Sequence, residues 1–140
     1  MDLRFGTDGV RARAGTELDE AAVCALGLAS AGLLGSDRVA IGRDTRESGP
    51  GLVHALAEGF SEGGLEVVSL GMVPTPAVAC TASIDGIAGA MVSGSHNPWW
   101  DNGVKLFSAG GHKLGDETQA VIQGLWQQRP THGPTGGGAG

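Results

Sequence analysis

Residues 87–107, IAGAMVSGSHNPWWDNGVKLF, decide the fold of this chain. The first six residues form a continuous apolar run, which is typical of a central strand buried on both faces of a sheet. The run ends in small and polar residues, and Pro98 stops any helix from continuing there. Ser95 is therefore expected on a loop after a buried strand, where a rigid sheet often positions catalytic groups. A plain Ser/Asn/Pro turn without chemistry is the alternative.

Strands and helices alternate on either side of this stretch. The patterns predict strands at residues 3–6, 38–42, 65–70, 86–92 and 104–107. They predict helices at residues 20–34, from Ser48 or Pro50 to Gly63, at 77–83 and at 116–127. Asp19 is expected to cap the first helix and Gly35 to end it. This alternation predicts a three-layer α/β/α domain with a mixed, mostly parallel sheet of about four strands.

The carboxyl ends of the predicted strands are where a ligand site is expected in such a sheet. Ser95, the pair Thr45-Arg46 and the pair Gly71-Met72 each follow or end a predicted strand. They are therefore expected to converge on one rim of the sheet.

Length and composition limit the class of protein. The 140 residues suit one domain, predicted at residues 1–128, followed by a Gly/Pro-rich flexible tail or linker at 129–140. The net charge of −6 argues against nucleic-acid binding, for which a basic surface is expected. No signal pattern or membrane-spanning apolar run is visible, which predicts a cytoplasmic protein without a membrane partner. Cys24 and Cys80 are expected to be free thiols.

Four sequence blocks resemble the α-D-phosphohexomutase family. The loop around Ser95 resembles the family's phosphoserine loop. The other blocks, in the family's order, are FGTDGVR at residues 5–11, GRDTR at 42–46 and VPTPA at 73–77. The Trp-Trp-Asp-Asn-Gly continuation at residues 99–103 is most similar to the phosphoglucosamine mutase branch.

The resemblance implies a phosphosugar mutase that interconverts glucosamine 6-phosphate and glucosamine 1-phosphate. Phospho-Ser95 would transfer its phosphoryl group to a sugar hydroxyl, and a bisphosphate intermediate would turn around in the site. Ser95 would then recover a phosphoryl group from the other position. The resemblance also implies Mg²⁺ as cofactor, held in part by the phosphate on Ser95, and a hexose bisphosphate as activator.

Four other residues of the matching motifs are candidates for the site. His96 has a pKa suited to a general acid or base, with a hydrogen bond to the loop as the alternative role. Lys105 is expected to neutralise the phosphate or assist proton transfer, unless it is simply solvated. Arg11 is expected to bind the phosphate or the sugar through its planar guanidinium. Asn97 is assigned to the same phosphate site, with its side chain expected to brace the loop.

Several neighbouring residues have a supporting role or an open one. Ser93 is expected to brace the turn that carries Ser95. Arg43, Asp44 and Arg46 form either a structural ion-pair cluster or a support for the site, and the sequence leaves both interpretations open. Gly94 stands where the family usually has alanine, which is expected to loosen the loop. Ala12 follows Arg11 where the family usually has glycine, so the turn geometry there is in doubt.

The chain resembles only the first of the family's four domains. The Asp-Gly-Asp-x-Asp loop that supplies further magnesium ligands in the second domain is absent from the sequence. Domains II–IV are therefore expected as partners, in cis or in trans, and the 140-residue chain alone is expected to be inactive. A phosphomannomutase or phosphoglucomutase domain I, or a non-catalytic anion-binding or interaction module, are the alternatives. A serine hydrolase is disfavoured because no Gly-x-Ser-x-Gly elbow is present.

Overall fold

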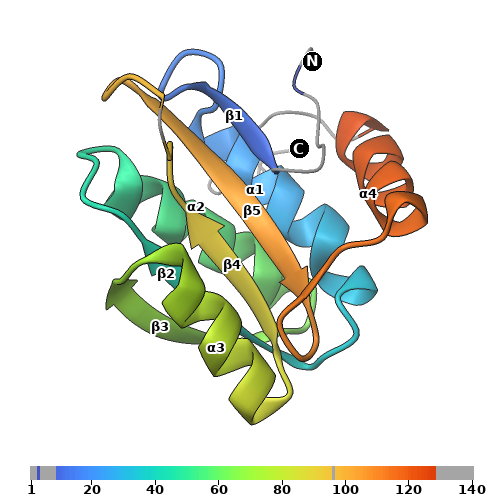
Figure 1. The fold of residues 1–140 in the computed structure, drawn as a ribbon. Helices are drawn as coiled ribbons and strands as arrows, with labels where there is room; N and C mark the ends of the chain where they lie inside the picture. The colour runs from blue at the N-terminus through green and yellow to red at the C-terminus, as the bar shows by residue number, and fades with distance from the viewer. Residues whose placement is uncertain (1–2, 4–8, 96, 129–140) are drawn as a thin grey trace.

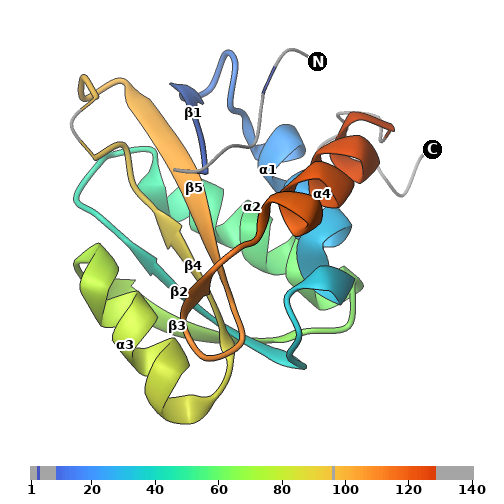
Figure 2. The ribbon, with the colours of Figure 1, turned by 45° about the vertical axis from the view of Figure 1, so that its right-hand side comes forward.

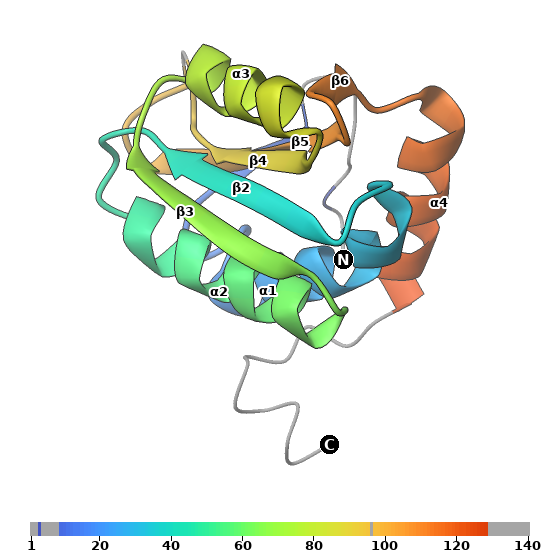
Figure 3. The same cartoon turned by 90° about the horizontal axis from the view of Figure 1, so that it is seen from below.

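A three-layer α/β/α arrangement is seen in the computed structural model, which describes residues 3, 9–95 and 97–128. Figure 3 shows helices α1 (Glu20–Ser30) and α2 (Gly49–Glu62) on one face of the sheet and α3 (Thr75–Asp85) on the other. This confirms the predicted layers. The predicted tail, residues 129–140, lies outside the described residues.

The sheet is mixed, as predicted. Within the described residues its strands are β1 (Val10–Arg13), β2 (Arg38–Arg43), β3 (Glu66–Met72), β4 (Ala88–Val92), β5 (Asp101–Ser108) and β6 (His112–Lys113). They follow the order β1-β5-β4-β2-β3, with β6 paired to β5. β2 pairs in parallel with β3 and β4, whereas β5 pairs antiparallel with β1, β4 and β6.

Two details of the predicted sheet are wrong. Among the described residues the sheet has six strands rather than about four, and antiparallel pairs outnumber parallel ones. The cause is the loop after β4, which is too short for a crossover and returns the chain beside the strand it has just left. In Figure 1, β5 runs as a long strand between β4 and β1. The first strand is at Val10–Arg13, and residues 4–6 of the predicted strand lie outside the described residues.

The helices begin and end close to the predicted positions. The carboxylate of Asp19 accepts a hydrogen bond from the Ala22 N–H at 2.8 Å, which confirms the predicted cap. The first helix is shorter than predicted, because its last turn continues as a 3₁₀ segment, η1 (Ala31–Leu33). The final helix is α4 (Asp116–Gln128). None of the helices in the described part of the chain combines the length and apolar character needed to cross a bilayer.

The main core lies between the sheet and helices α1 and α2. Buried apolar side chains from all of these elements meet there, including those of Leu26, Ile41 and Phe60. Trp126 of α4 is fully buried, and its indole N–H donates to the Ala22 carbonyl at 2.9 Å. This contact fixes α4 against α1, and Figure 2 shows the two helices as neighbours.

A second and smaller apolar cluster lies beneath α3. Its buried members are Val78, Met91 and Phe107. Fewer buried apolar side chains pack beneath α3 than against α1 and α2. The two cysteines are free, Cys24 being buried and Cys80 exposed.

Candidate active site

The segments expected at one rim do meet there. β2 and β4 are parallel and end together, with Arg43 paired to Val92. β3 ends beside them, because Met72 pairs with Arg43. The loop after β2 and the loop after β4 therefore leave the same edge of the sheet. The second of these loops carries Ser95.

A cavity of about 290 Å³ brings three of the candidate residues together. Ser95 from the loop, Arg11 from β1 and Lys105 from β5 line it. Arg11 pairs with Gly103, two residues before Lys105, so both cationic side chains project from the same face of the sheet. Ser93, Met91, Val104 and Thr75 complete the described lining.

The electrostatic character of this cavity is positive. It is lined by two cations, and none of its described lining residues is acidic. Thr75 is the first residue of α3, and a helix N-terminus carries a partial positive charge. The Lys105 ammonium lies 5.6 Å from the centroid of the Phe107 ring, within the range of a cation–π contact. The arrangement suits an anion such as a phosphate group.

The backbone at Ser95 has an unusual conformation. Its φ is +53°, and no other non-glycine residue in the described ranges has a positive φ. This region is disfavoured for residues with a side chain, and such strain is often found at functional sites. The Ser95 N–H donates to the Ser93 hydroxyl at 3.0 Å, so Ser93 braces the turn as predicted.

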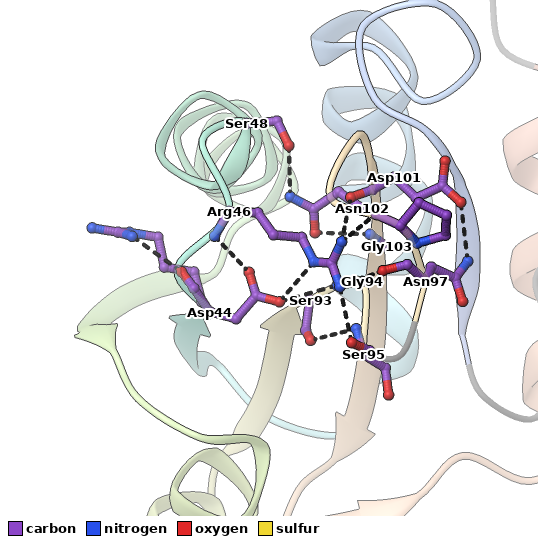
Figure 4. Close-up of polar contacts among 12 residues, drawn as sticks. Asp44, Arg46, Ser48, Ser93, Gly94, Ser95, Asn97, Asp101, Asn102 and Gly103 are labelled. Carbon is purple, nitrogen blue, oxygen red and sulfur yellow. Dashed lines mark hydrogen bonds and ion pairs between the residues drawn. The ribbon is translucent and has the colours of Figure 1, made fainter.

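The Arg46 side chain is the centre of the hydrogen bonds that hold the loop carrying Ser95. Its side chain is only 12% exposed, and it extends from the loop after β2 across to the loop after β4 (Figure 4). Its Nε donates to the Asp44 carboxylate at 3.1 Å. Its two Nη atoms donate to backbone carbonyls, which belong to Ser95 at 2.8 Å, Asn97 at 3.0 Å, Asp101 at 3.3 Å and Pro98.

Asp44 also links the loop after β2 to the loop after β4. Its carboxylate accepts from the Arg46 N–H at 3.1 Å and from the Gly94 N–H at 3.2 Å. Burial alone would raise the pKa of Asp44, but hydrogen bonds from the Arg46 backbone, the Ser93 hydroxyl, the Arg46 guanidinium and the Gly94 N–H lower it below its ordinary value. Asp44 is therefore charged at neutral pH. The structure answers the open question: the pair of Asp44 and Arg46 is an ion pair that supports the site loop.

Gly94 has the opposite effect to the one expected. A Cβ at this position would overlap with the guanidinium of Arg46. The absence of a side chain makes room for Arg46, so glycine allows the loop to be held rather than loosening it.

Two asparagines complete the support. The Asn97 amide donates to the Asp101 carboxylate at 3.2 Å, which braces the loop as expected. Asn102 is fully buried; it donates to the Ser48 hydroxyl at 2.8 Å and accepts from the Gly103 N–H. It thereby ties the start of β5 to the start of α2. The sequence analysis did not identify Asn102 as a supporting residue. The available signal was an amide side chain immediately before Gly103.

A second hollow lies on the other side of Ser95. Its volume is about 530 Å³, and its described lining is Asp44, Thr45, Arg46, Glu47, Ser95, Asn97 and Trp99. Trp99 is 73% exposed, and its ring meets that of Trp100 edge to face, with 5.5 Å between the ring centroids. Ser95 therefore stands between a cationic cavity and a more open hollow with an aromatic wall.

Two expected features of the site, His96 and a magnesium site, are not found among the described residues. His96 is outside the described residues. The described part of the chain contains no cluster of three or more His, Cys, Asp or Glu side chains that could hold a metal ion. The Asp44 carboxylate is already engaged by Arg46 and Gly94, and the Asp101 carboxylate accepts from the Asn97 amide. These residues do not form a magnesium site without further ligands.

Comparison with known proteins supplies the evolutionary context. Residues 2–131 match the family model described as phosphoglucomutase/phosphomannomutase, alpha/beta/alpha domain I. The chain is also similar to proteins named phosphoglucosamine mutase. Across its whole length it is 46% identical to the one from Rhodococcus jostii, 47% to the one from Mycolicibacterium vanbaalenii and 43% to the one from Corynebacterium glutamicum. The chain spans about a third of the length of these curated relatives, at 33%.

Solved structures agree with the sequence matches. A phosphoglucomutase/phosphomannomutase family protein from Burkholderia thailandensis is 34% identical, with a TM-score of 0.78 over 92% of this chain and 31% of its own. A structure from Thermus thermophilus is 32% identical, with a TM-score of 0.83 over 95% of this chain and 31% of its own.

Proposed function

We propose a function from one premise: the chain belongs to the phosphoglucomutase/phosphomannomutase family, and it corresponds to the first α/β/α domain of that family. In our proposal this domain carries the phosphoserine of an enzyme that interconverts glucosamine 6-phosphate and glucosamine 1-phosphate. The observation that carries the proposal is the cavity that Ser95 shares with Arg11 and Lys105.

The charge balance of the cavity favours a phosphorylated Ser95. A phosphoserine adds nearly two negative charges and three acceptor oxygens. Two cationic side chains and the N-terminus of α3 line the same cavity and offset that charge. Arg11 suits the phosphate oxygens because its planar guanidinium can donate to two of them at once. Ser95 itself is exposed, so a sugar phosphate can reach it.

The reaction proposed for this site is a phosphoryl transfer in two directions. A hydroxyl oxygen of the sugar monophosphate forms a bond to phosphorus while the bond from phosphorus to Ser95 Oγ breaks. The hydroxyl proton passes to a base, for which His96 is the candidate, and Ser95 Oγ takes up a proton as it leaves. Lys105 neutralises the phosphate or assists these proton transfers. The bisphosphate then turns around and returns its other phosphoryl group to Ser95, leaving a monophosphate with the phosphate moved.

The proposal also includes parts that this chain does not supply. Mg²⁺ would offset charge during phosphoryl transfer, and its further ligands would come from outside this chain. The two thirds of the relatives' length that the chain lacks are proposed to supply these ligands and the sugar-binding groups. A hexose bisphosphate is proposed as the activator that keeps Ser95 phosphorylated. We also propose residues 1–128 as the domain, and the cytoplasm as its compartment.

The amino-sugar substrate is favoured over the other hexose phosphates. The three relatives compared above are named phosphoglucosamine mutase, and they are 43–47% identical to this chain across its whole length. The Burkholderia protein, whose name covers the phosphoglucomutases and phosphomannomutases, is 34% identical.

A chimeric enzyme tests the proposal. Residues 1–128 would replace the matching third of the Rhodococcus jostii relative, and both glucosamine phosphates would be followed with a hexose bisphosphate present. We expect turnover from the chimera and loss of nearly all of it in Ser95→Ala. Lys105→Ala should lose less, because acid–base help contributes about 10²–10⁴-fold. A Ser95→Ala chimera that keeps its activity would overturn the proposal.

A further inference from the structure

We propose that Arg46, oriented by Asp44, is a positioning residue that holds Ser95 in its positive-φ conformation and so presents the serine for phosphoryl transfer. The proposal rests on the function proposed for Ser95. It concerns a residue that touches neither the serine hydroxyl nor the cavity shared by Arg11 and Lys105.

The hydrogen bonds of Arg46 show why it acts through the loop. A guanidinium has five N–H donors. In Arg46, Nε is bonded to Asp44, and the two Nη atoms are bonded to the carbonyls of Ser95, Asn97, Pro98 and Asp101. Five acceptors thus match five donors. No N–H group is left for a substrate phosphate, so Arg46 has a role in shaping the loop rather than in binding the ligand.

The geometry of these acceptors links Arg46 to the strained serine. Four carbonyls, three from the loop and one from Asp101 at the start of β5, converge on a single side chain. This convergence requires the chain to turn sharply between Ser93 and Asp101. The positive φ of Ser95 is one element of that turn, and the Ser95 carbonyl bonds directly to Nη2 at 2.8 Å. A strained conformation persists only when its surroundings fix it. Arg46 and Ser93 are the groups bonded to the backbone of Ser95 on its two sides.

The support for Arg46 comes from both loops. Asp44 accepts from the Arg46 guanidinium and from the Gly94 N–H, the residue just before Ser95. Gly94 leaves the space that the guanidinium occupies. Lysine cannot replace this arrangement, because its ammonium has three donors on a compact group rather than a planar fork of five.

Solution NMR of the 140-residue chain tests the conformational part without any enzyme activity. A strong intraresidue Hα–HN NOE marks a positive φ at Ser95. We expect this signal in the wild type and in Arg38→Met, a matched control at the amino end of β2. We expect it to be lost in Arg46→Lys, while the amide signals of β2 and β4 stay unchanged. Retention of the Ser95 signal in Arg46→Lys would overturn the proposal.

A second variant keeps the test decisive if Arg46→Lys fails to fold. Asp44→Ala leaves Arg46 chemically intact but removes the carboxylate that accepts from its Nε and from the Gly94 N–H. We expect the same loss of the Ser95 signal with the sheet intact. An Asp44→Ala chain whose Ser95 keeps a positive φ would contradict the role assigned to the Asp44 and Arg46 pair.

Kinetics of the chimeric enzyme test the functional part. We expect kcat of Arg46→Lys to fall about 10²-fold, since a misplacement of about 1 Å has that effect, with KM nearly unchanged because Arg46 does not bind the substrate. Arg38→Met should keep the wild-type values. If Arg46→Lys keeps its kcat while Ser95→Ala is inactive, the positioning role is wrong. If Ser95→Ala remains active, the function proposed for Ser95 is wrong instead.

Discussion

Replacing Gly59 with alanine tests how closely helices α1 and α2 pack. Gly59 is buried on the face of α2 that meets α1. A Cβ there would overlap with the carbonyl oxygen of Cys24 and lie 2.9 Å from the Leu28 nitrogen. Gly27 on α1 is also confined, because its Cβ would lie 2.7 Å from the Leu56 carbonyl oxygen. These obstacles are backbone atoms, which cannot rotate away, so the two helices would have to separate.

The magnitude follows from two opposing effects. Overpacking a core typically costs about 1–3 kcal/mol. Alanine is more favourable than glycine in a helix by about 1 kcal/mol. Because the obstacle at Gly59 is backbone on backbone, we take the upper part of the first range and expect a net loss of about 1–2 kcal/mol.

Gly124 in α4 provides the matched control. A Cβ at Gly124 would meet no atom within 4 Å, so Gly124→Ala should stabilise the domain by about 0.5–1 kcal/mol. Urea denaturation followed by circular dichroism gives the free energy of unfolding of both variants and of the wild type. If Gly59→Ala proves as stable as Gly124→Ala, the reasoning about backbone contact between α1 and α2 is refuted.

Further predictions concern the core, the site and the isolated chain. Trp126→Ala should lower the free energy of unfolding by about 3–5 kcal/mol in urea denaturation, and a loss below about 1 kcal/mol would mean that α4 is not docked through this indole. Because the pKa of Asp44 is lowered on folding, its stabilising effect is present above about pH 4 and is lost as the pH falls through the lowered value. Asp44→Asn should therefore be less stable at neutral pH and lose less stability on acidification than the wild type; parallel pH curves from urea denaturation would contradict this. The purified 140-residue chain should show little or no mutase turnover in the assay used for the chimera, and robust turnover would mean that it needs no other domain.

Much of the fold is predictable from local patterns. The apolar run before Ser93 marks β4 because a strand covered on both faces must be apolar along its length. Asp19 marks the start of α1 because a carboxylate there can accept from the first free N–H groups. The start of β5 was missed because Asp101 and Asn102 have low strand propensity. Their place in the sheet is decided by β1, which pairs with them from far away in the sequence.

The site residues that belong to a motif were predictable from the sequence. The residues whose role depends on contacts between segments far apart in the sequence were not. Motifs that resemble one family predict Ser95, Arg11 and Lys105 as site residues, and the structure brings them to one cavity. Arg46 lies 49 residues from Ser95, and its role depends on where four carbonyls point. No local pattern reports the direction of a carbonyl group, so the sequence left its role undecided.

The position of the phosphate on the chain tests the central claim most directly. The chimera would be purified after turnover with a glucosamine phosphate and digested, and fragmentation of the peptide that contains both Ser93 and Ser95 would locate the modification. We predict phosphate on Ser95 and an unmodified Ser93, since the Ser93 hydroxyl accepts a hydrogen bond from the Ser95 N–H and braces the turn. Phosphate on Ser93 with Ser95 unmodified would contradict the account.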